Sequence, residues 1–183
     1  MTNASRTGTR VDMDDAGRDA VPDYIDEFST VLERDDVEEW EMVAALFHSA
    51  PGWFDVLARL RDRIVRVFGL KTASNNPRVI PPPYLPGMRM GFFRVIHVVP
   101  GEALLGDEDT HLDFRTALRL KRDGGRTCLT VSTAVHTRNR FGRIYLALVR
   151  PVHRLVVPIM LKGMARILTT RSLPANFYSR ART

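Results

Sequence analysis

The sequence predicts an α+β fold in which an antiparallel sheet packs against helices that precede and follow it. Between residues 90 and 138, apolar and polar residues alternate with the period of two that is typical of strands. Pro100-Gly101 and Gly124-Gly125 interrupt this alternation as tight turns, which predicts antiparallel pairing. Residues 36–49, 51–70 and 141–168 instead repeat their apolar residues at helical spacing.

Length and composition predict a single soluble domain. The 183 residues suffice for one core, and Cys128 is the only cysteine, which excludes a disulfide framework or a multi-cysteine zinc site. We expect a disordered N-terminal tail over residues 1–21, a domain over residues 22–170 and a C-terminal tail over residues 171–183. The first twenty residues contain no apolar segment typical of secretory signals, so the expected location is cytoplasmic.

Charge is distributed unevenly along the chain. The net charge is +6, yet residues 1–50 hold 13 of the 21 acidic residues and only 4 of the 27 basic ones. A basic body attracts nucleic acid or anionic lipid when its cations cluster, but here they are scattered over the predicted helices and strands. We therefore expect no nucleic-acid partner, and the acidic N-terminal part is expected to pack beside the basic remainder.

Three elements are predicted before the main run of strands. Residues 22–33 alternate as a first strand. Residues 36–49 predict a helix with Asp36 as its N-cap and early acidic residues suited to a helix N-terminus. A second helix is predicted over residues 51–70, where Pro51 restarts the chain and Gly69 ends the helix.

A long loop and three strand-like runs follow. Residues 71–89 contain five prolines, concentrated in the segment 77–86, and loops of this length are often lids or binding segments. The strand-like runs are residues 90–99, residues 102–109 together with 110–122, and residues 126–138.

The last predicted element is a long amphipathic helix over residues 141–168. We expect it to bend at Pro151 and Pro158, because proline lacks an amide hydrogen and crowds the preceding turn. Its internal Arg and Lys residues argue against a transmembrane segment. One face is expected to be apolar and to pack on the sheet; it comprises Ile144, Leu148, Val152, Leu155, Ile159 and Ile167.

The register of the strands can be predicted from the turns. A two-residue loop at Gly124-Gly125 places Asp123 opposite Arg126 and Asp113 opposite His136. The resulting apolar face pairs Leu120 with Leu129, Leu118 with Val131, Thr116 with Thr133, Phe114 with Val135 and Leu112 with Thr137. The same logic at Pro100-Gly101 pairs Val98 with Ala103, Ile96 with Leu105 and Arg94 with Asp107. Arg94 and Asp107 are therefore expected to form a salt bridge at the rim of the apolar face.

The stretch 106-GDEDTHLDFRTALRL-120 concentrates acidic residues and a histidine. Asp109, His111, Asp113 and His136 could supply oxygen and nitrogen ligands to a divalent metal, but the run lacks the glycine and glutamate of a calcium loop. The register instead places Asp107–Asp109 in a turn and points His111 and Asp113 to the outer face. We expect no metal site there and no nucleotide cofactor, because the sequence has no glycine-rich phosphate-binding motif.

Several segments together resemble a known family. These segments are DYIDEFS, LFHSAPGWFDVLARLRDRIVRVFGLK, LLGDEDTHLDFR and TVSTAVHTRNRFGRIYLALVRPVHRLVVPIML. Over residues 22–170 they resemble an uncharacterised bacterial family, a domain of unknown function grouped with the SRPBCC (START/Bet v 1-like) helix-grip domains. The resemblance implies a curved antiparallel sheet gripping the long C-terminal helix, with a cavity between them. Related domains are joined to NAD(P)-binding short-chain-dehydrogenase-like modules, which implies an accessory role beside redox enzymes.

Three functions are compatible with these expectations. The first is binding of a small hydrophobic molecule between the sheet and the long helix, with Arg94, Thr116, Thr133 and Tyr145 as polar anchors. The second is a cyclase or hydrolase that uses His153, Tyr145 or Arg94 as acid–base groups in the same cavity. The third is a module that docks a redox partner through its basic surface. The expected cavity walls are Phe92, Ile96, Leu105, Phe114, Val131 and Val135 on the sheet, and Tyr145, Leu148, Val152 and Leu155 on the helix.

Overall fold

The computed structural model describes residues 21–53 and 80–180. In this part of the chain, six strands form one antiparallel sheet in the order β1-β6-β5-β4-β3-β2. The predicted second helix and the first part of the proline-rich loop lie outside the described residues. The elements are β1 (Tyr24–Leu32), α1 (Glu39–His48), β2 (Arg89–Met90), β3 (Phe93–Val99), β4 (Glu102–Glu108), β5 (Leu112–Asp123), β6 (Arg126–Thr137), α3 (Arg140–Thr170) and α4 (Ala175–Arg180).

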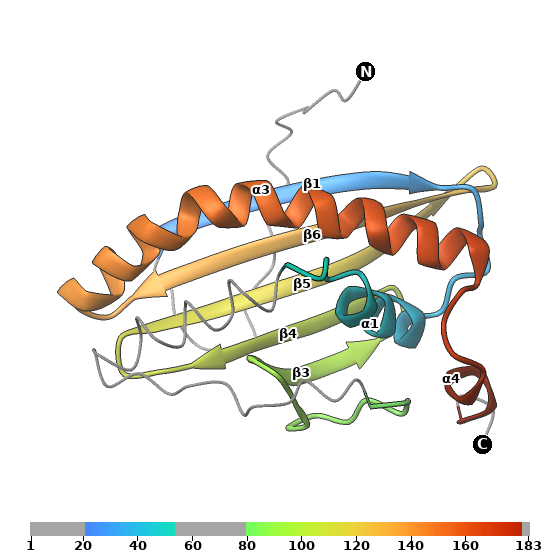
Figure 1. Ribbon diagram of the computed structural model, residues 1–183, viewed down its shortest axis with the longest axis horizontal. Coiled ribbons are helices and arrows are strands. Elements are labelled where there is room, and N and C mark those ends of the chain that lie inside the picture. Colours follow the sequence, from blue (N-terminus) through green and yellow to red (C-terminus); the bar gives the residue numbers. More distant parts are fainter. Residues whose placement is uncertain (1–20, 54–79, 181–183) are drawn as a thin grey trace.

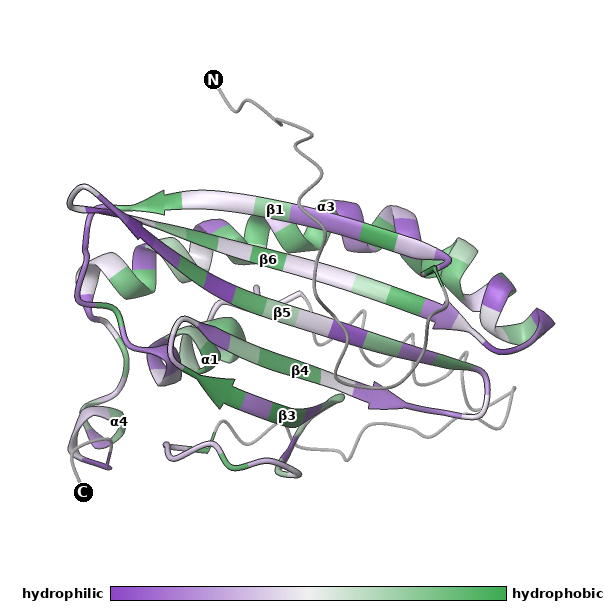
Figure 2. Ribbon diagram, turned by 180° about the vertical axis from the view of Figure 1, so that it is seen from behind, coloured by the Kyte–Doolittle hydropathy of each residue, from purple (hydrophilic) through white to green (hydrophobic). Residues whose placement is uncertain are grey.

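The predicted α+β class is confirmed. The sheet is curved, and the long helix α3 runs along β1 and β6 while α1 lies over the β3–β4 side (Figure 1). Seen from behind, the strands lie in front of both helices, so α1 and α3 cover the same face of the sheet (Figure 2). We call this helix-covered side the inner face.

The predicted β5–β6 register is confirmed at every pair. Leu118 lies opposite Val131, Thr116 opposite Thr133 and Asp113 opposite His136. The glycines at the turn both have positive φ, 55° for Gly124 and 85° for Gly125, as this tight hairpin requires. A two-residue turn therefore suffices to fix which side chains of two twelve-residue strands lie on the inner face.

The predicted β3–β4 register is correct only near the turn. Val98 lies opposite Ala103 as expected, but a bulge at Ile96 shifts the pairing, so that Val95 lies opposite Leu105 and Arg94 opposite Gly106. One extra residue in a strand reverses the alternation of all side chains beyond it. The expected strand pairings of Ile96 with Leu105 and of Arg94 with Asp107 are therefore wrong.

The bulge also changes which aromatic residue enters the core. Phe92, expected on the inner face, lies with Gly91 in the turn between β2 and β3, where Gly91 has a φ of 61°. Phe93 packs against the core instead, with its ring 5.7 Å from that of Phe47 on α1 and 5.5 Å from that of Phe114 on β5. These edge-to-face contacts join α1 to the inner face of the sheet.

Helix α1 begins two residues later than predicted, because the cap is Glu38 and not Asp36. The Glu38 amide donates to the Glu41 carboxylate at 2.9 Å, and the two glutamates form a reciprocal capping box. Asp36 instead binds Arg34 at 2.5 Å and also contacts Arg171. The acidic segment before α1 therefore contributes to an ion-pair network rather than to a simple helix cap.

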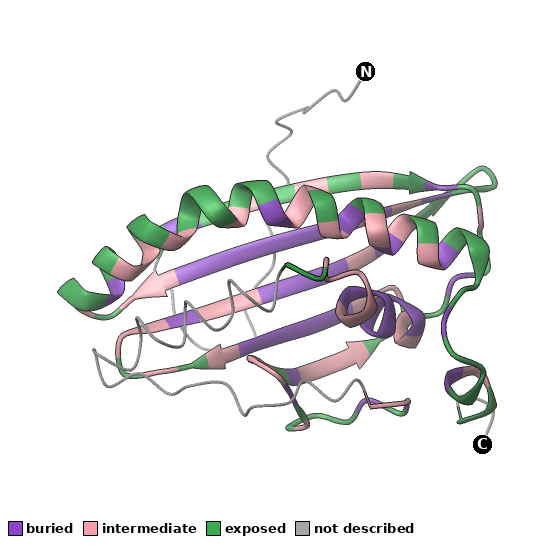
Figure 3. Cartoon of the chain, viewed as in Figure 1, coloured by how far each residue is buried: buried purple, intermediate pink, exposed green. Residues whose placement is uncertain are grey.

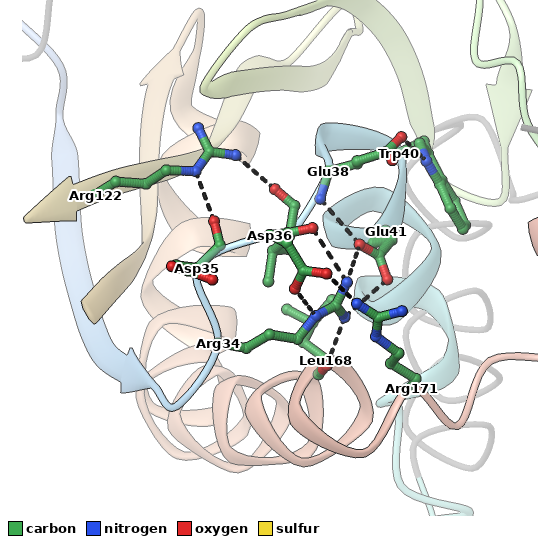
Figure 4. Close-up of polar contacts among 10 residues, drawn as sticks. Arg34, Asp35, Asp36, Glu38, Trp40, Glu41, Arg122, Leu168 and Arg171 are labelled. Carbon is green, nitrogen blue, oxygen red and sulfur yellow. Dashed lines mark hydrogen bonds and ion pairs between the residues drawn. The ribbon is translucent and has the colours of Figure 1, made fainter. Parts of the chain in front are cut away.

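Arg34 is the centre of that network (Figure 4). Its guanidinium donates to both carboxylate oxygens of Glu41, at 3.0 and 2.9 Å, and to the carbonyl oxygen of Leu168 near the C-terminus of α3 at 2.8 Å. The side chains of Arg34 and Glu41 are 11% and 3% exposed. This buried pair joins the segment after β1 to the start of α1 and the end of α3.

Helix α3 continues through Pro151 and Pro158 for 31 residues. Asn139 caps its start by accepting a hydrogen bond from the Gly142 amide at 3.1 Å, and Arg171 ends it with a φ of 50°. The predicted packing face is wrong over most of the helix. Ile144, Leu148, Val152, Leu155 and Ile159 are exposed, whereas Gly142, Val156, Leu161, Met164 and Leu168 are buried.

The expected C-terminal tail contains structure that the sequence did not predict. The short helix α4 follows α3, and Leu173 and Phe177 are buried in the same core as α1 and the sheet. The ring of Phe177 lies 5.2 Å from that of His48 in an edge-to-face contact. A short apolar segment without helical periodicity gave no signal of this packing.

Candidate functional site

The inner face of the sheet carries the strand residues that the sequence assigned to a cavity wall, except those displaced by the bulge. Leu105, Thr116, Val131, Thr133 and Val135 are all buried there. Phe114 is half-buried on the same face. Register alone was therefore sufficient to group these side chains from three strands.

An uncovered apolar stripe runs along the first two thirds of α3. Its residues follow one another at intervals of three or four, which places them on one side of the helix. Their exposed fractions range from 38% for Val152 to 64% for Leu155. Figure 3 shows the exposed positions along the helix beside the buried strands β6 and β5. The stripe consists of Phe141, Ile144, Leu148, Val152, Leu155 and Ile159.

Three of the four residues expected to form the helix wall belong to this exposed stripe. Tyr145 is half-buried, whereas Leu148, Val152 and Leu155 are exposed and do not pack as core against the sheet. The C-terminal half of α3 packs in the core with α1, which orients the whole helix. The sequence missed this because α3 has apolar residues on two sides, and periodicity does not show which side packs.

A polar cluster lies between β1 and α3. The Tyr24 hydroxyl donates to Asp26 Oδ2 at 2.5 Å, and Nδ1 of His153 lies 3.0 Å from the same oxygen. The rings of Tyr24 and His153 meet edge to face at 6.0 Å, and the guanidinium of Arg150 lies 5.4 Å from the Tyr24 ring centre. His153 was a sequence candidate, but Tyr24 and Asp26 were not, since polar residues in a strand gave no signal of a site.

Burial and the hydrogen bond to Asp26 raise the pKa of Tyr24 to about 12. A tyrosine in the unfolded chain ionises at about pH 10. As the pH rises, the unfolded state therefore loses this proton before the folded state does. The stability that Tyr24 contributes is therefore complete below about pH 10 and decreases as the pH rises towards the folded value.

We expect the difference in the free energy of unfolding between the wild type and Tyr24→Phe to decrease between roughly pH 9 and pH 11, the range around the pKa of a free tyrosine. Urea unfolding of both proteins at several pH values measures it, and the other tyrosines cancel in the comparison. A difference that stays constant over this range would show that Tyr24 ionises as it does in a free peptide.

Arg94 and Asp107 lie at a separate pocket near the edge of the sheet. This pocket has a volume of about 370 Å³ and is lined by Gly87, Arg94, Val95, Ile96, Gly106, Asp107, Glu108 and Arg115. Arg94 and Asp107 do form an ion pair, at 3.9 Å, although Asp107 has a closer partner in Arg89 at 3.2 Å. Because the side chain of Arg94 is 52% exposed, the pair is a weak surface contact.

The acid-rich stretch 106–113 forms ion pairs with neighbouring arginines. Asp113 is buried and contacts Arg138 at 2.7 Å, and Glu108 binds Arg115 at 2.5 Å. Asp113 lies on the outer face as expected, but it is not exposed there, because Arg138 covers it. His111 contacts Asn139, the cap of α3. Among the described residues, no three His, Cys, Asp or Glu side chains are placed to hold a metal ion.

Helix α3 is long and apolar enough to cross a membrane, judged by length and composition only. Val156, Leu161, Met164 and Leu168 nevertheless belong to the domain core, and α3 contacts α1, β1 and β6. The apolar character of the helix therefore has two origins, a packed C-terminal half and the uncovered stripe.

Comparison with known proteins identifies a family. No curated protein sequence matches this chain. Similar solved structures include TTHA0849 from Thermus thermophilus, with 11% identity, a TM-score of 0.39 and coverage of 82% of this chain and 100% of that one. Another is the hypothetical protein jhp0584 from Helicobacter pylori, with 13% identity, a TM-score of 0.40 and coverage of 80% and 89%. These TM-scores establish neither a shared fold nor a shared function. Residues 20–160 match the family described as protein of unknown function (DUF2867), and the chain therefore belongs to that family.

Proposed function

We propose that this protein binds a small hydrophobic molecule between the inner face of the sheet and α3, in the manner of a helix-grip domain. The observation that carries the proposal is the uncovered apolar stripe of α3, which lies on a helix that runs along the inner face. Monomeric soluble proteins rarely leave contiguous apolar patches exposed, and such patches mark binding surfaces.

A ligand that covers the apolar stripe gains a favourable free energy of binding. Covering the exposed half of one leucine or isoleucine contributes roughly 1 kcal/mol, and four such side chains, together with Val152, follow one another from Ile144 to Ile159. Part of this gain of about 5 kcal/mol offsets the lost freedom of the ligand, so the stripe alone supports an affinity no tighter than the millimolar range (about −4 kcal/mol). The half-buried Phe114 and the buried Val131 and Val135 supply the opposite, sheet-side wall.

Acid–base catalysis in the same space is a second candidate function. One observation favours it: His153 Nδ1 lies 3.0 Å from the Asp26 carboxylate, a geometry that orients an imidazole for proton transfer. Of the other predicted acid–base groups, Arg94 lies in the separate pocket with Asp107 and does not join this pair. Since Arg94 and His153 lie in different places and do not converge on one space, ligand binding is the better supported function.

The test of ligand binding is a double substitution in the stripe, Leu148→Ser with Leu155→Ser. It removes apolar contact area from an exposed surface, so the fold is retained while the affinity for an apolar probe decreases roughly tenfold or more. Fluorescence titration with 8-anilinonaphthalene-1-sulfonate measures the affinity.

The matched control is Ile25→Ser with Val31→Ser. These residues are equally exposed, at 53% and 60%, but lie on the outer face of β1. Equal probe affinity in the two double variants, or no saturable binding to the wild type, contradicts the proposal. Native mass spectrometry of the purified protein adds a direct search for a retained ligand.

A further inference from the structure

Asp26 is a buried carboxylate whose two oxygen atoms are used unequally. Oδ2 accepts from the Tyr24 hydroxyl and faces His153 Nδ1, at 2.5 and 3.0 Å. Oδ1 is buried and has no hydrogen-bond partner within the described part of the chain. The Asp26 side chain is only 10% exposed, so bulk water does not compensate this oxygen freely.

A buried acceptor without a partner is costly. The loss is about 1–3 kcal/mol for a neutral group and more for a charged one, and native proteins contain few such atoms. The contact between His153 on α3 and Asp26 on β1 uses Oδ2 alone, so attachment of the helix does not account for an aspartate rather than a residue with one acceptor. The free oxygen indicates a donor that the described part of the chain does not supply.

Asp26 belongs to a row of polar side chains on the otherwise apolar inner face. Asp26 lies opposite Thr133 on β6, and Thr133 lies opposite Thr116 on β5, so three polar side chains form a row across the inner face. The neighbouring pairs on either side contain Val131 and Val135. A polar row in an apolar wall orients a ligand that is apolar along its length and polar at one point.

We propose that Asp26 Oδ1 accepts a hydrogen bond from a hydroxyl group of the bound molecule, so that the ligand class is an apolar alcohol. The inference rests on the proposed function, because it places this contact in the same space between the sheet and α3. The Thr133 hydroxyl donates in turn to the oxygen of the ligand hydroxyl, so that the ligand hydroxyl contacts both Asp26 and Thr133.

The test uses two isomers that differ only in hydrogen-bond donation, 1-nonanol and methyl octyl ether. Isothermal titration calorimetry with the wild type is expected to give about tenfold tighter binding of the alcohol, the effect of one hydrogen bond to a buried carboxylate. In Asp26→Asn, the amide oxygen keeps the donors Tyr24 and His153 and the NH₂ group replaces Oδ1. An acceptor thus becomes a donor, and the preference for the alcohol falls to about one.

The matched control is Glu27→Gln, the same acid-to-amide change on the outer face of β1, where Glu27 binds Ser132. It is expected to keep the tenfold preference (about 1.4 kcal/mol). Circular dichroism melting curves establish that both variants are folded. A further measurement uses the wild type alone. The Asp26 carboxyl ¹³C resonance is expected to shift on addition of 1-nonanol and not on addition of the ether.

The outcomes separate the two proposals. If neither isomer binds the wild type, both the proposed function and the anchor are overturned. If both isomers bind with equal affinity, or if Asp26→Asn keeps the preference for the alcohol, only the anchor is overturned and hydrophobic ligand binding stands.

Discussion

Replacing Arg34 by alanine is expected to lower the free energy of unfolding by about 3–5 kcal/mol. The substitution leaves the Glu41 carboxylate, which is 3% exposed, without the two charge-assisted hydrogen bonds that compensate its burial. It also removes the donor to the Leu168 carbonyl, so the end of α3 loses this polar contact with the segment after β1. Urea unfolding followed by circular dichroism measures the change.

Two further variants show whether the uncompensated charge is the cause. Arg126→Ala removes an exposed arginine at the β5–β6 turn and is expected to change stability by less than about 0.5 kcal/mol. The double variant Arg34→Met with Glu41→Leu removes both charges and is expected to recover most of the loss, because apolar residues of similar size replace buried ion pairs well. A double variant as unstable as Arg34→Ala would mean that packing, and not charge, dominates.

Replacing Leu118 by alanine is expected to destabilise the protein by about 2–5 kcal/mol. Leu118 is fully buried at the centre of the inner face, opposite Val131 on β6 and Ala103 on β4. Ala103 is small, so the neighbouring strand cannot fill the space that the missing atoms leave. Thermal and urea unfolding report the loss.

The control for Leu118→Ala is Ile25→Ala on the outer face of β1, where the side chain is 53% exposed. It removes a similar number of apolar atoms and is expected to cost less than about 1 kcal/mol. Similar losses in the two variants would contradict the assignment of the helix-covered face as the core.

The core of the sheet could be predicted because local signals and tertiary structure agree there. The Gly124-Gly125 turn set the β5–β6 register, and the register placed Thr116, Val131, Thr133 and Val135 on one face. The β3 strand could not be predicted to the same accuracy, since Val95 and Ile96 are both apolar and β-branched. Either could face the core, and only pairing with Leu105 shows that Val95 does.

The candidate site depends more on tertiary structure than the sheet does. His153 could be named from the sequence, but its partners Tyr24 and Asp26 lie 127 or more residues away in the chain. A polar residue in a strand has the same pattern whether it faces solvent or a buried cluster. The position of α3 on β1 decides that Asp26 is buried.

By itself the sequence determined the α+β class, the antiparallel order of the central strands, the β5–β6 register and the long C-terminal helix. These follow from periodicity and turn chemistry, which act over a few residues. Only the tertiary structure decided which side of α3 packs, where β3 bulges, and which charges are compensated, such as Arg34 with Glu41. Those features depend on segments that are distant in the chain, and the free energy of their contact leaves no local pattern in the sequence.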